Sequence, residues 1–233
     1  MRRIPSIPEL RSRVRDFWAH SVTNKIVVLC VAIFVAQSLH WFFANAFSLN
    51  AVWVHEGFWL NFVSYGFLHG DFWHLALNML ALYFAGNAVE RYDSVRNALI
   101  AFFGGVILGG ISWYACVLAF AVAPLEATLV GASAGIAALF AYFSVLYRDS
   151  EIRAMIFFVL PVKMRAWVIF AVLAALSLLG LVADELPALR SGLQQSVSIA
   201  HSAHLGGILF GAIFAFAYDR FRGRFGNVRY FHR

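Results

Sequence analysis

Six apolar segments constrain the fold of this chain more than any other feature of its sequence. Each is near the length that an α-helix needs to cross a hydrocarbon core of about 30 Å. The chain is also 62% hydrophobic and 13% charged, whereas ordinary globular domains are about 45–50% apolar and about 25% charged. A soluble protein would lack polar residues to cover its surface, so the pattern predicts an all-α membrane protein with six transmembrane helices. The segments are 26–45, 73–89, 98–123, 133–147, 164–183 and 200–218.

The positions of the basic residues predict the orientation of these helices. If six spans alternate, 17 of the 18 Lys and Arg residues fall on one side of the membrane, and Arg190 is the exception. Because basic residues are enriched in cytoplasmic connections, both termini are predicted to be cytoplasmic. The chain then divides into a basic N-terminal segment (1–25), a six-helix core (26–218) and a basic tail (219–233). The net charge of +6 reflects this topology and contact with a lipid bilayer, and we expect no nucleic-acid partner.

The arginine-rich N-terminus resembles a signal or transit segment in charge. The apolar run that follows it is long enough to span a membrane, and Glu9 and Asp16 are unusual in a transit peptide. We therefore expect a retained first helix. A compact six-helix chain fits a bacterial plasma membrane, with an organellar membrane as the alternative.

The connection 46–72 differs from the others because it is long, aromatic and free of Lys and Arg. Aromatic residues are enriched where a protein meets the membrane–water interface. We expect this segment to lie in that interface. Its large aromatic residues include Trp53, Phe58, Trp59, Phe62, Tyr65 and Phe67.

Polar side chains inside membrane segments are costly and are candidates for function. Counted from the cytoplasmic ends at a rise of 1.5 Å per residue, Ser133 and His204 both lie about 21 Å deep. His74 and Asn78, which share one helix face, lie at about 22 and 17 Å. Taken singly, each has a simpler explanation in helix packing or a buried hydrogen bond, but packing does not predict one shared depth. Spacing does not separate His204 from His201.

A serine and a histidine at one depth fit nucleophilic catalysis. A hydroxyl becomes an effective nucleophile when a neighbouring base takes its proton, and a histidine serves as that base near neutral pH. The amide of Asn78 or the ring of His74 could donate hydrogen bonds to an oxyanion. The outer halves of these three helices hold no acidic residue, so a Ser–His dyad is predicted rather than a triad.

Three motifs in this order make the chain resemble the rhomboid family of intramembrane serine proteases. The second segment carries H-x-x-x-N as His74 to Asn78, and the fourth begins with G-x-S as Gly131 to Ser133. The sixth carries a histidine followed by two glycines, from His204 to Gly207. The runs "FLHGDFWHLALNML" and "GNAVE" are also typical of the family.

The resemblance implies a serine endopeptidase that cleaves peptide bonds in or near transmembrane helices of membrane proteins. Ser133 would be the nucleophile and His204 the general base. His74, Asn78 and the backbone N–H of Ser133 would form the oxyanion site. Such a reaction requires neither a metal nor another cofactor, and its active site would open to the extracytoplasmic side. The resemblance also implies that a face carrying Gly207 lets the sixth helix approach the fourth.

The chain departs from the family pattern at three places. Ala134 stands where members usually have glycine, and Gly135 follows it. Ala137 replaces an aromatic residue that many members carry. The first loop reads Trp59-Leu60-Asn61 where members often show Trp-Arg.

Three alternatives compete with proteolysis. The first is a catalytically silent rhomboid-like protein that binds membrane helices, although such proteins usually lack the serine or the histidine. The second is metal transport through His69, His74, His201 and His204, although the chain has no H-E-x-x-H motif. The third is a soluble hydrolase elbow at G-x-S-x-G, which needs a βα framework that six apolar spans do not provide.

Overall fold

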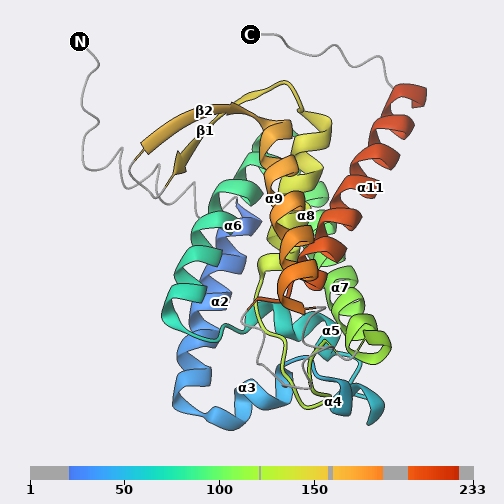
Figure 1. Ribbon diagram of the computed structural model, residues 1–233. Helices are drawn as coiled ribbons and strands as arrows, with labels where there is room; N and C mark the ends of the chain where they lie inside the picture. The colour runs from blue at the N-terminus through green and yellow to red at the C-terminus, as the bar shows by residue number, and fades with distance from the viewer. Residues whose placement is uncertain (1–20, 121, 157–159, 186–198, 226–233) are drawn as a thin grey trace, which may run out of the picture.

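The computed structural model is a bundle of long helices with a group of short helices at one end (Figure 1). It describes residues 21–120, 122–156, 160–185 and 199–225. The long helices are α2 (Val22–Leu39), α6 (Phe72–Tyr92), α7 (Val95–Phe120), α8 (Ser133–Leu146), α9 (Ala166–Gly180) and α11 (His201–Phe225). A π-helical turn, η2 (Leu181–Glu185), continues α9. Each of the six predicted apolar segments therefore contains a helix.

The first segment is the one whose predicted extent differs most. We expected one span over 26–45, but α2 ends at Leu39 and α3 (Trp41–Phe47) begins after a break at His40. The backbone of His40 is extended, with φ −137° and ψ 98°. Close to this break, the side chain of Gln37 bonds to both the N–H and the carbonyl oxygen of His69. A polar contact with the next loop thus accompanies the end of the first helix.

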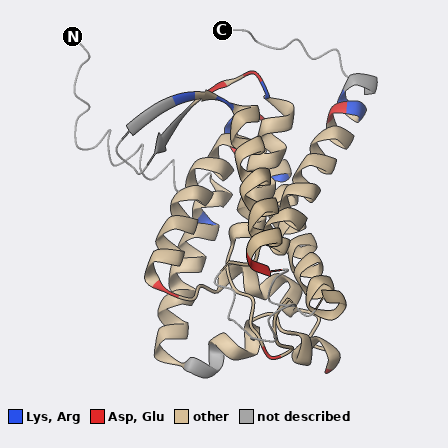
Figure 2. Cartoon of the chain, viewed as in Figure 1, with Lys and Arg blue, Asp and Glu red and all other residues tan. Residues whose placement is uncertain are grey.

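Consecutive long helices among those described alternate in direction along the bundle (Figure 1). By length and composition, four helical stretches could cross a membrane: Val22–Leu39, Val95–Phe120, Ala166–Glu185 and His201–Arg222. Helix α8 is apolar but has only 14 residues. The Lys and Arg residues that the structure describes gather toward the end of the bundle where α8 ends and α9 begins (Figure 2).

A β-hairpin lies at this basic end, where we predicted only a charged connection. Strand β1 (Glu151–Ile156) pairs antiparallel with β2 (Leu160–Arg165), and Glu151 faces Arg165 in the register. Both strands are rich in β-branched and other large apolar residues, which favour extended structure. The all-α prediction missed the hairpin because the four charged residues of its strands indicated only a connection between two helices.

Small residues bring α7, α8 and α11 into close contact. A β-carbon at Gly207 would overlap the carbonyl oxygen of Ala134, and one at Gly211 would overlap that of Ala138. On α7, Gly105 packs in the same way against the methyl group of Ala138. The expectation that Gly207 lets α11 approach α8 is thus confirmed, in agreement with the use of small residues where membrane helices meet.

A buried carboxylate joins four elements at the basic end. Asp93, in the turn after α6, accepts hydrogen bonds from Asn97 at 2.7 Å, from the Tyr218 hydroxyl at 3.0 Å and from the Tyr142 hydroxyl. Arg222 lies 3.9 Å away, and the Asp93 side chain is only 3% exposed. Since α7, α8 and α11 each contribute a partner, this network fixes the ends of these three helices relative to α6.

The aromatic connection folds into short helices at the opposite end. These are α3, α4 (Ala51–His55), α5 (Asn61–Ser64) and the 3₁₀ turn η1 (Tyr65–Phe67). Trp59 and Phe58 are exposed, as expected of side chains at a membrane interface. Asn61 is buried, and its amide donates to the carbonyl oxygens of Ala46 and Ser48. This residue of the divergent Trp59-Leu60-Asn61 stretch therefore holds the connection together.

We predict that Gly211→Val destabilises the protein, because its side chain would overlap the Ala138 carbonyl group. Overpacking of this kind costs about 1–3 kcal/mol of unfolding free energy. Thermal unfolding in detergent measures the effect. Ala217→Val is the matched control, since Ala217 lies exposed on the same helix. Equal unfolding temperatures for the two variants would contradict the prediction.

Candidate active site

The chain around Ser133 is held by backbone hydrogen bonds to the first connection. Leu129 and Leu49 exchange two of them, at 2.7 and 3.1 Å, in an isolated antiparallel bridge. The N–H of Gly131 then donates to the carbonyl oxygen of Tyr65 at 3.0 Å. Ser133 follows as the first residue of α8. The serine is thus fixed from both sides, by the loop before it and by the helix that it begins.

Gly131 has a backbone that only glycine adopts readily. Its φ is +126°, and a β-carbon at this position would lie 2.8 Å from Nε2 of His74. The lack of a side chain therefore serves the turn into α8 and also makes room for the imidazole. The pattern of Gly131 two residues before Ser133 has a physical basis in both constraints.

His204 contacts Ser133 directly, as their estimated depths indicated. Nε2 of the imidazole lies 2.8 Å from Oγ of the serine. When the imidazole carries its proton on Nδ1, Nε2 accepts the hydroxyl hydrogen, which is the arrangement that activates a serine. The structure also separates the two candidate histidines, because His201 instead pairs with Asp184 at 3.4 Å.

His74 and Asn78 face the same space from α6. The N–H of Gly70 donates to Nδ1 of His74 at 3.4 Å, so the neutral ring carries its hydrogen on Nε2, the atom beside Gly131. Asn78 is buried, and its amide nitrogen donates to the carbonyl oxygen of His74 at 2.9 Å. An amide nitrogen has two hydrogens, so one remains for another acceptor.

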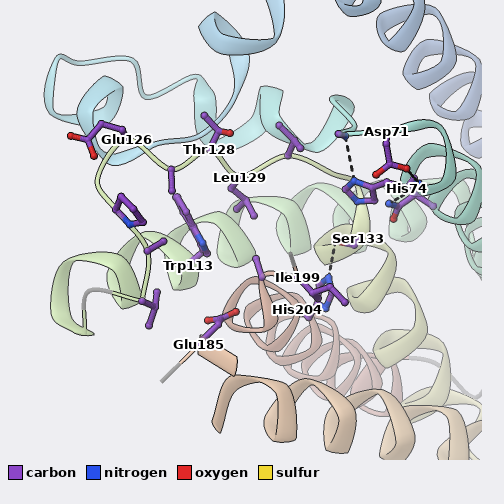
Figure 3. A pocket seen from close by; sticks show the side chains of 18 residues that line it. Asp71, His74, Trp113, Glu126, Thr128, Leu129, Ser133, Glu185, Ile199 and His204 are labelled. Atoms are coloured by element: carbon purple, nitrogen blue, oxygen red, sulfur yellow. Dashed lines mark hydrogen bonds between the residues drawn. The ribbon is translucent and has the colours of Figure 1, made fainter. Parts of the chain in front are cut away.

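All four predicted residues line one cavity of about 730 Å³ (Figure 3). The labelled side chains of Ser133, His204 and His74 project toward the same region. The cavity is further bounded by the loop 122–130 and by Trp113 of α7. Three helices and a loop thus place a hydroxyl, two imidazoles and an amide around a space large enough for a short peptide segment.

The two departures within α8 are accommodated by its neighbours. The methyl group of Ala134 points at Gly109 of α7, where a side chain would collide with it. Ala137 is buried in a small cluster with Ala141 and Ile208, against which Phe170 of α9 packs. The surrounding helices therefore fit both departures: the methyl group that Ala134 has in place of glycine, and the small side chain that Ala137 has in place of an aromatic residue.

The sequence analysis missed a carboxylate in this cavity. Glu185, at the end of η2, is 1% exposed and lines the same space as Ser133 and His204. It lies on a different helix from the predicted residues, just beyond the predicted end of the fifth apolar segment. Its signal in the sequence is the pair Asp184-Glu185, the first charged residues after Arg165.

The histidines invoked for metal transport form two separate ring pairs. His69 packs on His74 with centroids 5.2 Å apart, and His201 lies 6.1 Å from His204. Within the described residues, no group of three or more His, Cys, Asp or Glu is arranged to hold a metal ion. The geometry therefore gives the metal-transport alternative no support.

Comparison with known proteins places this helix bundle in a family. The Rhomboid domain matches residues 56–221, which is more than half of the chain. A similar protein is the mitochondrial rhomboid protein 1 of Saccharomyces cerevisiae, 29% identical over 157 residues. That alignment covers 66% of this chain but only 40% of the yeast protein. The apolar helices and this match define an integral membrane protein, and the chain belongs to the rhomboid family.

We predict that Gly131→Ala slows reaction of Ser133 with a fluorophosphonate probe by about tenfold or more, because the new methyl group displaces His74. Labelling rates in detergent measure this effect. Gly57→Ala is the control: Gly57 also has a positive φ, +96°, but no atom lies within 4 Å of the added carbon. Labelling of Gly131→Ala at the rate of the parent protein and of Gly57→Ala would contradict the prediction.

Proposed function

We propose that the protein is an intramembrane serine endopeptidase that cleaves membrane proteins in or near their transmembrane helices. The observation that carries this proposal is the 2.8 Å contact between Nε2 of His204 and Oγ of Ser133. Its location at the wall of a cavity beside His74 and Asn78 supports the same conclusion. Membership of the rhomboid family agrees with this chemistry.

In the proposed reaction, Oγ of Ser133 attacks the carbonyl carbon of the scissile bond while His204 takes the hydroxyl proton. Negative charge develops on the substrate oxygen. It would be met by Nε2–H of His74, the amide of Asn78 and the Ser133 N–H, which has no acceptor inside its own helix. His204 then gives its proton to the leaving amine, and an acyl-enzyme remains. Water, deprotonated by His204, hydrolyses that ester and restores the serine.

The membrane setting is part of the proposal. We infer that α6 and α8 cross the bilayer together with the four stretches long enough to do so, which makes six spans. The gathering of described Lys and Arg at one end supports a cytoplasmic location for that end (Figure 2). Both termini would then be cytoplasmic, with 1–25 and 219–233 as basic segments around the core 26–218. Most of these two segments lies outside the described residues, as does Arg190.

The cavity would then open toward the extracytoplasmic side. Helix α8 rises about 21 Å from its cytoplasmic end to Ser133, so water reaches the serine from the opposite face. The peptide groups of a substrate helix are hydrogen-bonded to one another within the helix. The helix must therefore unwind locally before a peptide bond can enter the cavity. Segments with glycine, proline or other weak helix formers are the substrates that unwind most readily. We propose a bacterial plasma membrane as the location, while the mitochondrial name of the yeast relative makes an organellar membrane the alternative.

We predict that Ser133→Ala and His204→Ala each abolish cleavage of single-span model substrates in liposomes. Asn78→Ala should lower kcat by about 10²–10³, the usual effect of removing one oxyanion donor. Product formation on gels, with cleavage sites located by mass spectrometry, measures all three. Ser144→Ala is a control, because Ser144 is buried on the same helix but does not line the cavity.

Labelling with a fluorophosphonate probe distinguishes the proposal from a catalytically silent protein that binds membrane helices. The folded parent protein should be labelled and Ser133→Ala should not. Cleavage by Ser133→Ala at the parental rate would refute the proposed mechanism. A folded parent protein that neither labels nor cleaves would support the silent alternative.

A further inference from the structure

The carboxylate of Glu185 is held rigidly at the wall of the cavity. Its Oε1 accepts the N–H of Ser202 at 3.0 Å. Ser202 is the second residue of α11, and Ala200 before the helix has no side-chain acceptor to cap it. A carboxylate at a helix N-terminus is favoured by the partial positive charge there. One oxygen of Glu185 is therefore used to hold the side chain in place.

The other oxygen has no such partner. Oε2 of Glu185 is buried and lacks a hydrogen-bond partner among the described residues. The residue as a whole is 1% exposed, so bulk water does little to screen its charge. A buried acceptor that is left unpaired is costly to the folded protein. An oxygen retained in that condition, on a residue that lines the same cavity as Ser133 and His204, points to a role toward what enters the cavity.

Within the described part of the chain, no Lys or Arg forms an ion pair with this carboxylate. No Lys or Arg stands among the described residues that line the cavity, whereas two further acids do, Asp71 and Glu126 (Figure 3). Both are exposed, and Asp71 also caps α6 by accepting the N–H of His74. The neighbouring His201 already faces Asp184. The cavity thus has acids at its rim and one buried acid in its wall.

We propose that this cavity selects substrates by charge, taking basic or neutral residues on the extracytoplasmic side of the scissile bond and rejecting acidic ones. Glu185 is the specificity-determining residue, with smaller contributions from Asp71 and Glu126. In a site of low dielectric constant, a buried charge acts across several ångströms, so the selection does not require direct contact. The inference rests on the proposed protease function and adds the class of substrate to it.

The test uses the full chain in liposomes and three single-span substrates that differ at one residue. The three substrates carry Lys, Gln or Glu at this residue. The set is made again for each of the positions nearest the cleavage site on its extracytoplasmic side. We expect kcat/KM for the Lys substrate to exceed that for the Glu substrate by about tenfold or more at one position at least. Glu185→Gln keeps an oxygen for the Ser202 N–H but removes the charge. It should reduce this ratio to about one to threefold.

Two controls identify the source of the selection. Glu56→Gln removes an exposed charge that does not line the cavity and should leave the ratio unchanged. High salt screens exposed charges far more than buried ones, so most of the ratio should persist in it. A ratio that disappears in high salt would assign the selection to the exposed acids and overturn the role of Glu185.

The outcomes separate this inference from the proposed function. If the parent protein cleaves the Lys and Glu substrates equally at every position while Ser133→Ala is inactive, the charge selection is wrong and the protease function stands. The parental ratio alone decides this point, even if Glu185→Gln fails to fold. An undiminished ratio in folded Glu185→Gln would also overturn the inference. Cleavage by Ser133→Ala would instead refute the function on which it rests.

Discussion

The close approach of α8 and α11 is the contact on which the rest of the structure depends. The two helices run in the same direction (Figure 1), and glycines of α11 lie on carbonyl oxygens of α8 at intervals of four residues: Gly207 on Ala134 and Gly211 on Ala138. The contact between His204 and Ser133 lies next to these contacts, three residues before Gly207 and one residue before Ala134. The candidate catalytic pair and the helix packing therefore share a single interface, and a helix separation suited to larger side chains would part Ser133 from His204.

Around this interface, irregular backbone lies among apolar helices, and its N–H and carbonyl groups need hydrogen-bond partners. Unpaired backbone groups are costly in such surroundings. The chain before Ser133 satisfies them by pairing with the first connection, at Leu49 and at Tyr65. Asn61 and Gln37 pair further backbone groups of that connection. The short helices at this end thus support the backbone before Ser133, and they also expose Phe58 and Trp59 as side chains suited to a membrane interface.

Much of the architecture follows from the sequence, because the length of an apolar run and the rise of a helix are both nearly invariant. Counting residues from the charged ends placed Ser133 and His204 at one depth, and the structure brings them into contact. Features that depend on contacts between distant segments could not be predicted from the sequence. The break at His40 lies beside a contact with the connection 46–72, and the charges of the hairpin after α8 indicated only a connection between helices. Glu185 was missed because only the folded chain brings the end of the fifth helix beside the start of the sixth.

The assignment of Ser133 to α8 and His204 to α11 has a consequence for biosynthesis. The two residues are separated by 71 positions, and α11 is synthesised after the other long helices that the structure describes. While the membrane holds α2 to α9 alone, the serine has no imidazole beside it, and the Asp93 network lacks Tyr218 and Arg222. In the proposed enzyme, α11 therefore completes the Asp93 network and the Ser–His pair together. Such a nascent chain would be unable to cut its neighbours before α11 has been synthesised.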